Sequence, residues 1–200
     1  MFAKSMTGIN GSSAFDTANA RAELLRAVDL CHPGWNRLRE LTFSPDSSSC
    51  PAWLPWKERV FATILWPRIA EARSACAAGD LRALADCDQA IDSALPAGSR
   101  APSSRAGRLL VAHYSAPKSE RLWRRYQSLI GSGEAPGHLA TLCALRGAIF
   151  HLSSIAISGA YIFLEAKAGL PRSGVDLWVN MVVDCLTTQC GPKISGLRAA

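Results

Sequence analysis

The sequence predicts an all-α protein, folded as a compact irregular bundle of about seven to eight helices. Apolar residues recur mainly at the three- and four-residue spacing of a helix, and no convincing strand alternation appears. Glycine and proline fall between the periodic stretches, where helices end. Of the 200 residues, 48% are hydrophobic, which is enough for one domain with a core. We therefore expect a single helical domain over residues 16–190.

The first third of that domain is expected to hold two helices and a loop, after a flexible N-terminus at residues 1–15. A helix starts near Asp16 and stops near His32, because the residue before Pro33 avoids the α region. Its apolar positions are Leu24, Leu25 and Val28. A short helix with Trp35, Leu38 and Leu41 follows. Residues 42–55 are rich in serine and proline and predict an irregular, mobile loop.

Helices continue through the middle of the chain. Residues 56–78 have helical spacing, but Pro67 lacks an amide proton and is expected to kink the helix or start a new one. Gly79 suits the end of this helix, and Asp80 suits the cap of the next, which runs to Pro96. A turn-rich segment at 97–104 precedes a helix over 104–114. Ser119 is then expected to cap a helix that Gly131 closes.

The last third is expected to hold a long apolar element over 138–169, reached through a flexible link at 131–137. Ser158 and Gly159 are the expected point of bending, because glycine in a helix interior costs about 0.5–1 kcal/mol relative to alanine. Ser173 and Asp176 resemble a capping box for a last helix. Gly191 and Pro192 mark its end, and residues 191–200 are expected to fray.

Within the long element, residues 147–164 contain no formally charged side chain, which raises the question of a membrane span. A spanning helix needs about 20 apolar residues, and this stretch contains three serines, a histidine and two glycines. We therefore expect a buried core helix and no transmembrane span. His151 is expected to be a hydrogen-bonded core or interface residue.

The net charge of +6 is concentrated in one segment. Residues 100–125 contain seven basic side chains and one acid, whereas the rest of the chain is balanced. Such a patch suits an acidic protein partner, an anionic lipid surface or a nucleic acid, although a solvated helix face explains it equally well. We expect a protein partner and no nucleic acid. The candidate partner-binding residues are Arg105, Arg108, Arg121, Arg124 and Arg125.

No catalytic set, metal site or cofactor site is expected. The seven cysteines contain no CxxC pair and are expected to be buried reduced thiols. The four histidines are dispersed, and Asp86, Asp88 and Asp92 are expected to be solvated helix charges because no calcium loop surrounds them. The N-terminus has no apolar region typical of a signal peptide, so a cytoplasmic protein is expected. These features favour a non-enzymatic interaction protein.

Two family resemblances follow. The segment from Asp29 to Trp35 resembles the start of the SctK/YscK family of type III secretion proteins, and Gly147, Phe150 and Leu152 before Leu170-Pro171 resemble its later helical segment. Ala77 to Leu84 resembles its middle region. This resemblance implies an adaptor that links the sorting platform scaffold to the inner-membrane ring protein, at the cytosolic face of the membrane. The family has a rhizobial nodulation member, which implies a role in nodulation.

The alternative is the UreF family, whose members are all-α urease accessory adaptors for nickel delivery. Three short segments resemble its central helices: Gly79-Asp80-Leu81, Ser103-Ser104-Arg105 and Gly107-Arg108-Leu109-Leu110. The Leu-Pro-x-Gly-Gly segment expected near that family's start is missing. The secretion family is the preferred interpretation, with the urease accessory family as the alternative.

Overall fold

The computed structural model describes residues 17–39, 41–42, 53–114, 120–169 and 175–190, and over these the protein is all-α, as predicted. No strand occurs among them. The helices are α1 (Thr17–Cys31), η1 (Trp35–Arg37), α2 (Trp53–Trp56), η3 (Lys57–Leu65), α3 (Trp66–Ala78), α4 (Leu81–Ala94), α5 (Ala97–His113), α6 (Arg121–Ser132), α7 (Leu139–Ile149), α8 (Ser154–Gly169) and α9 (Val175–Cys190).

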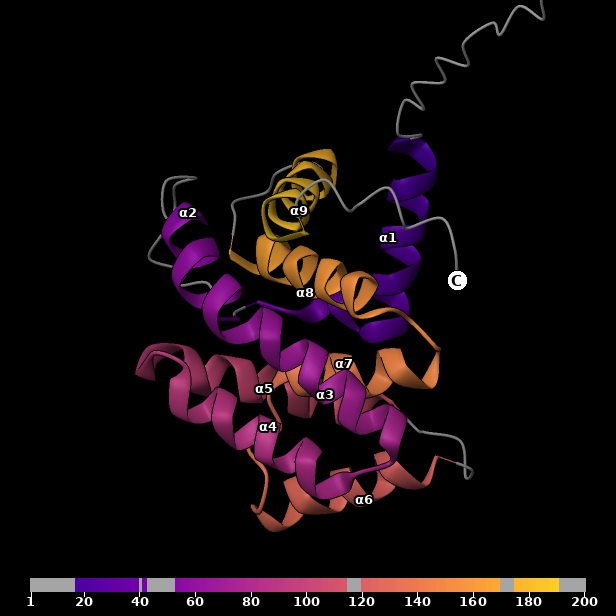
Figure 1. Ribbon diagram of the computed structural model, residues 1–200, viewed down its shortest axis with the longest axis vertical. Coiled ribbons are helices and arrows are strands. Elements are labelled where there is room, and N and C mark those ends of the chain that lie inside the picture. The colour runs from indigo at the N-terminus through magenta and orange to yellow at the C-terminus, as the bar shows by residue number, and fades with distance from the viewer. Residues whose placement is uncertain (1–16, 40, 43–52, 115–119, 170–174, 191–200) are drawn as a thin grey trace, which may run out of the picture.

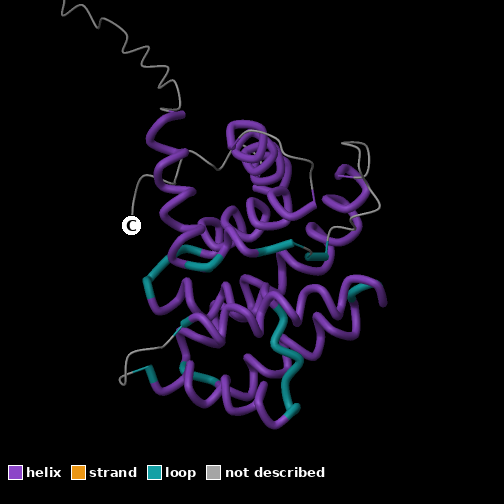
Figure 2. Tube along the Cα trace, turned by 180° about the vertical axis from the view of Figure 1, so that it is seen from behind, coloured by secondary structure: helices purple, strands orange, loops and turns teal. Residues whose placement is uncertain are grey.

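The helices form two groups joined through the middle of the molecule (Figures 1 and 2). Helices α1, α8 and α9 form one end, and α8 packs against both α1 and α9. Helices α4, α5 and α6 form the other end. Helix α7 lies between the groups and packs against α3, α5 and α1. Every residue of α7 from Leu139 to Gly147 is buried, so this helix is the centre of the fold.

One continuous helical rod, α2–η3–α3, crosses the molecule from Trp53 to Ala78 (Figure 1). Its middle, Lys57–Leu65, is a π-helix, in which each N–H reaches one residue further back than in an α-helix. Pro67 lies at the start of α3, directly after this segment. The prediction that Pro67 kinks the helix or starts a new one is therefore partly right, because the π-helix changes to an α-helix beside this residue. The rod starts three residues earlier than the predicted helix.

The junction between α3 and α4 follows the predicted caps. Gly79 has a φ of 68°, the left-handed conformation that glycine adopts without steric cost. Its N–H bonds to the carbonyl of Cys76, as in a common helix C-terminus. The side chain of Asp80 accepts a hydrogen bond from the N–H of Ala83, 3.0 Å away, and so caps α4.

The prediction of a turn at residues 97–104 is wrong, because α5 begins at Ala97 and includes Pro102. The proline ring removes one backbone donor, and tertiary packing outweighs this local cost. The hydroxyl of Ser99 donates to the carbonyl of Thr42 over 2.9 Å. Ser103, Ala106 and Gly107 are buried, so small side chains let α5 approach α7 closely.

The long element over 138–169 breaks at Phe150–Ser153, and not at Ser158 and Gly159 as predicted. His151 has a φ of 56°, which ends the helical path, and the hydroxyl of Ser153 then accepts a hydrogen bond from the N–H of Ala156 over 3.1 Å. Gly159 instead lets side chains of α9 and α1 pack closely against α8. A Cβ built on it would lie 3.3 Å from Leu186 of α9 and 3.5 Å from Leu24 of α1.

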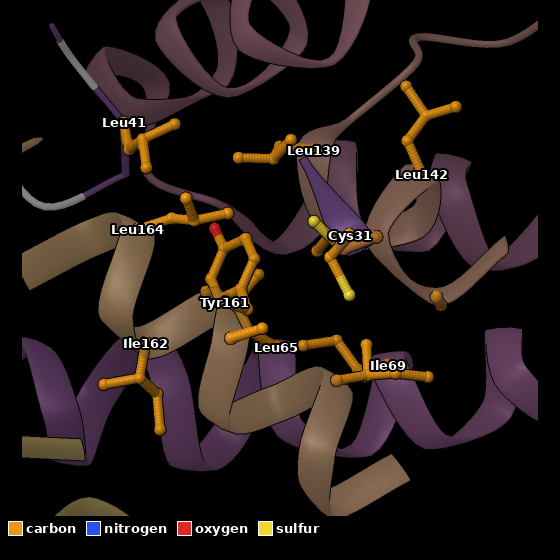
Figure 3. Packing of buried hydrophobic residues seen from close by; sticks show 14 of the residues in the cluster. Cys31, Leu41, Leu65, Ile69, Leu139, Leu142, Tyr161, Ile162 and Leu164 are labelled. Atoms are coloured by element: carbon orange, nitrogen blue, oxygen red, sulfur yellow. The ribbon is translucent and has the colours of Figure 1, made fainter. Parts of the chain in front are cut away.

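The core is continuous and is richest around α8. Figure 3 shows Tyr161 and Leu164 of α8 beside Leu41, Cys31 of α1, and Leu65 and Ile69 of the rod. All six side chains are buried. The prediction that residues 147–164 lie in the core is therefore right for the α8 part, whereas Phe150 and His151 are exposed in the turn. None of the described helices is both long and apolar enough for a membrane span.

Several predictions fall outside the described residues. These are the flexible N-terminus at 1–15, most of the loop at 42–55, the cap Ser119, the cap Ser173 and the tail at 191–200. The short helix expected around residues 35–41 is only a 3-10 turn, Trp35–Arg37. A single domain over 16–190 remains a prediction.

Candidate functional site

The predicted docking arginines include three on one exposed face of α6. Helix α6 buries Trp123, Tyr126 and Ile130, which recur at helical spacing along one side. Arg121, Arg124 and Arg125 are exposed on the helix. All three lie within its first five residues, where positive charge opposes the helix dipole. The core therefore fixes the orientation of α6, and its basic end costs a little local stability.

The other two predicted arginines, Arg105 and Arg108, are exposed on α5. The two helices meet where the ring of Tyr114 packs edge-on against Trp123, with centroids 4.8 Å apart. Arg100, in the same basic segment, has a structural role. Its side chain donates to the carbonyls of Leu95 (3.0 Å) and Ser93 (3.3 Å), at the end of α4.

A buried carboxylate, Asp88, caps the N-terminus of α7. Its oxygens accept hydrogen bonds from the N–H of Gly137 (2.6 Å), the N–H of His138 (3.0 Å) and the hydroxyl of Thr141 (2.7 Å). Asp88 has no exposed surface, so the expectation that it is a solvated helix charge is wrong. The helix dipole and the three donors compensate for its burial.

The neighbours of Asp88 extend this polar centre. Asp92 accepts from Nε2 of buried His138 over 3.1 Å, which joins the same two segments. Burial, followed by the nearby Asp88 carboxylate, raises the pKa of Tyr126 well above its usual value. Asp86 is exposed, as predicted. The three aspartates therefore have different roles: Asp88 holds the backbone of residues 137–138, Asp92 holds the ring of His138, and Asp86 is exposed.

A second buried carboxylate, Glu165 of α8, holds the segment after η1. It accepts hydrogen bonds from the hydroxyls of Tyr161 and Thr42 and from the Thr42 N–H, 3.3 Å away. Burial and the adjacent Glu165 raise the pKa of Tyr161 well above its usual value. Two residues further along, Nζ of Lys167 donates to the carbonyls of Trp35, Asn36 and Leu38. Helix α8 thus fixes residues 35–38 and Thr42.

Four basic or imidazole side chains meet where α1, α5 and α7 end, and we call them the cationic cluster: His32, Arg37, His113 and Arg146. His32 and Arg146 are buried, with 1% and 5% exposure, whereas Arg37 and His113 are exposed. Nη1 of Arg37 contacts Nε2 of His113, and Nε of Arg146 donates to the carbonyl of Leu30. The guanidinium of Arg146 stacks on the ring of Tyr114, 3.4 Å from its centroid.

Electrostatics distinguish the inner members of this cluster. Burial, with smaller contributions from the charges of Arg146 and His113, lowers the pKa of His32 from 6.5 to about 4. Burial also lowers the pKa of Arg146. Both ring nitrogens of His32 and Nη1 of Arg146 lack a hydrogen-bond partner. Sequence reasoning missed this cluster because its members come from three separate segments of the chain, at residues 32–37, 113 and 146, which only the fold brings together.

Cys31, Cys76, Cys87 and Cys143 form no disulfide, and Cys31, Cys87, Cys143 and Cys185 are buried. This confirms the expectation of buried thiols at those four positions. Burial raises the pKa of partly buried Cys76 to about 12 and that of Cys143 well above its usual value. Thiols with raised pKa values are poor nucleophiles. His151 is exposed in the α7–α8 turn, so the expectation of a core role is wrong, whereas an interface role stays a prediction.

Within the described ranges, no group of three or more His, Cys, Asp or Glu side chains is placed to hold a metal ion. A hollow of about 620 Å³ lies between α3 and α4 and includes Glu71, Asp80 and Cys87 among mostly alanine neighbours. Burial, followed by the charge of Glu71, raises the pKa of Cys87. The hollow therefore presents a protonated thiol beside a carboxylate.

The tightest backbone approach involves Gly107 of α5. A Cβ built on this residue would lie 2.0 Å from the carbonyl oxygen of Gly137 and 2.9 Å from Leu142. Only glycine fits this position, because both neighbours are fixed by the α7 cap. Together with Gly79 and Asp80, Gly107 shows that the short motifs of the middle region mark caps and close contacts.

The fold and these contacts define a small all-α bundle protein whose buried polar groups fix loops between helices. A family model identifies it further: UreF matches residues 45–168, about three fifths of the chain. The chain therefore belongs to the UreF family of urease accessory proteins, which are not enzymes. No curated protein and no solved structure matches. The match runs from just before α2 almost to the end of α8, and leaves α1 and α9 outside.

This finding overturns the preferred family assignment. The chain is not assigned to the SctK/YscK family, and the expected sorting platform, inner-membrane ring and nodulation roles are withdrawn. The structure supplies a physical reason for the error. Gly147, Phe150 and Leu152 were interpreted as part of a helical stretch, but they span the end of α7 and the following turn. The UreF-like motifs were the informative ones.

Proposed function

We propose that this chain is a non-enzymatic adaptor in urease maturation, acting in the cytoplasm through contacts with other accessory proteins. The UreF match over residues 45–168 carries this proposal. Members of that family work with the accessory proteins UreD and UreG, which are therefore the proposed partners. Nickel would be the cargo of the assembled partners.

We further propose that the exposed arginines of α6 contribute to docking. Arg121, Arg124 and Arg125 lie at the basic end of a helix whose other side is held by the core. Arg105 and Arg108 of α5 extend the basic surface as secondary candidates. Positive charge on a rigid helix speeds association with an acidic partner. This electrostatic attraction weakens as the ionic strength rises.

The adaptor role is tested by deleting the gene in a urease-positive host. Urease activity per amount of urease subunit should fall at least about tenfold, while the subunits are still produced. A plasmid copy of the chain should restore activity, and the nickel content of purified urease should follow activity. Full activity in the deletion strain, with normal nickel content, would refute the proposal. A tagged chain should also recover UreD or UreG from the host.

A further inference from the structure

The cationic cluster contains more hydrogen-bonding capacity than the protein itself uses. Arg146 has five N–H donors, and its recorded hydrogen bond is from Nε to Leu30. Its Nη1 and both ring nitrogens of His32 are buried without partners. A buried polar group left unpaired costs about 1–3 kcal/mol, and such groups are rare in folded proteins. Here two adjacent side chains share this condition.

The charge of the cluster is also uncompensated. Among the described residues, no carboxylate forms an ion pair or hydrogen bond with Arg37 or Arg146. The nearby Asp29 is bonded to Nε1 of Trp35, 2.7 Å away. Stacking on Tyr114 offsets part of the desolvation of Arg146, because a desolvated cation–π contact contributes about 2 kcal/mol. It does not supply a hydrogen-bond acceptor for Nη1.

The two imidazoles of the cluster lie close together. A Cβ built on Gly34 would lie 3.6 Å from Cε1 of His32 and 4.0 Å from Cγ of His113, so both imidazoles border this glycine. Nδ1 of His113 lies 2.7 Å from the carbonyl of Leu109, so the Nδ1–H donates there and Nε2 of the neutral ring accepts from Arg37. Arg37 and His113 are therefore the exposed members of the cluster, and His32 and Arg146 are its buried members.

Two exposed apolar side chains lie near the Arg37–His113 pair. Leu109, whose carbonyl holds His113, is 37% exposed, and Phe150, whose ring centroid lies 5.3 Å from Arg146, is also 37% exposed. A free inorganic anion would gain no binding energy from these apolar side chains. A peptide with a carboxylate beside an aliphatic side chain matches both parts of the surface.

We propose that the cationic cluster is a docking site for an acidic segment of a partner protein, with one carboxylate bound by the guanidinium of Arg37, beside His113, and drawn toward His32 and Arg146. Guanidinium groups bind carboxylates in a bidentate fork, which suits Arg37. Entry of the carboxylate replaces the Arg37–His113 contact. The inference rests on the proposed adaptor role only in requiring a protein partner, and it concerns residues other than the arginines of α6.

The test uses the full chain and a fluorescein-labelled peptide, Glu-Leu-Glu-Glu-Leu-Glu, with binding followed by fluorescence polarisation. A second peptide carries Gln at each Glu. The acidic peptide should bind at least about tenfold more tightly than the Gln peptide, and Arg37→Ala should weaken it by a similar factor. Arg39→Ala removes the same charge two residues away and should change affinity less than about twofold. Equal effects of the two substitutions would overturn the proposal.

Two further measurements examine the inner members and the ligand class. In the wild-type chain, the His32 Hε1 resonance should shift when the acidic peptide is added, and it should not shift with the Gln peptide. Absence of peptide binding, or binding without a His32 shift, would contradict the proposed geometry. Inorganic phosphate should bind at least about tenfold more weakly than the peptide, and equal affinity would overturn the assignment to a protein segment. None of these results depends on urease activation, so the proposed docking site and the proposed adaptor role can each fail independently of the other.

Discussion

At the scale of single residues, buried polar side chains determine where the loops of this protein lie. Asp88 fixes the 135–138 loop, Glu165 fixes Thr42, and Arg146 binds the end of α1. Each connects segments at least 49 residues apart in the chain. Because each is buried, removing one partner leaves the other unpaired, and the cost exceeds that of a surface substitution.

Replacing Asp88 with alanine should lower the free energy of unfolding by about 2–4 kcal/mol, since two backbone N–H groups and a hydroxyl lose their acceptor. Urea denaturation followed by circular dichroism measures this. Asp86→Ala, on the exposed side of the same helix, should change stability by less than about 0.5 kcal/mol. Equal losses in the two variants would mean that the cap contributes little.

The lowered pKa of His32 predicts a pH dependence of stability. Between pH 6.5 and about 4 the unfolded chain binds a proton at this ring and the folded chain does not. Stability from neutral His32 is therefore complete above pH 6.5 and falls by about 3 kcal/mol as the pH approaches 4. His32→Gln should flatten the curve of unfolding free energy between these values. A slope identical to that of the wild type would show that His32 is not responsible.

At the scale of elements, helix ends depend on a few cap positions. The α7–α8 turn contains one residue that stabilises it and one that destabilises it. Ser153 caps α8, whereas His151 adopts a left-handed conformation that is strained for a residue with a Cβ. Helix α6 begins with arginines, again against its own dipole. Local costs of this kind persist where the surrounding structure determines the conformation, and in α6 they coincide with the proposed docking surface.

Two substitutions in the α7–α8 turn should change stability in opposite directions. His151→Gly should stabilise the protein by about 0.5–1 kcal/mol, because a φ of 56° is strained for a residue with a Cβ. Ser153→Ala should destabilise it by about 1 kcal/mol through loss of the cap to Ala156. Thermal denaturation measures both. Destabilisation by glycine at 151 would contradict the described turn.

Changing Arg121, Arg124 and Arg125 together to glutamate should weaken binding to UreD or UreG at least about tenfold without lowering helicity, because acids suit a helix N-terminus. Surface plasmon resonance and circular dichroism measure the two effects. A control with Arg26, Arg59 and Arg82 changed to glutamate alters net charge equally on other exposed sites. Equal loss of binding in both variants would assign the effect to overall charge.

Sequence reasoning found the elements better than it found their contacts. Gly79 and Asp80 were predictable because a cap depends on adjacent residues. Gly159 was misjudged, since a glycine that breaks a helix and one that admits a neighbouring helix look alike in sequence. Asp88 had a usable signal: it shares the spacing of buried Leu84 and Ile91. The cationic cluster had none, because its members come together only through tertiary structure.

At the scale of the whole molecule, the part matched by the family model is not a self-sufficient unit. Helices α1 and α9 lie outside the match, yet both pack on α8 inside it. Trp35 packs edge-on against Phe163, and Val182 lies beside Gly159. Without these neighbours a helix with a long buried stretch would face water.

A chain limited to residues 45–168 should therefore fail to unfold cooperatively and should associate with itself. The exposed surface of α8 would include Phe163 and the Gly159 face. Urea titration and size-exclusion chromatography test this, with residues 17–190 as the control that keeps both flanking helices. A monomeric 45–168 chain with the unfolding midpoint of the control would show that α1 and α9 are accessories to the fold.

The seating of α1 on α8 also has a consequence during synthesis. Helix α1 ends at Cys31 and α8 begins at Ser154, so about 120 residues are translated between the two partners. At a translation rate of about 5–20 residues per second, roughly 6–25 s pass before α8 has begun to be made and can pack on the apolar side of α1. The nascent chain therefore exposes the α8-facing apolar side of α1 during that interval, before the finished protein meets any partner.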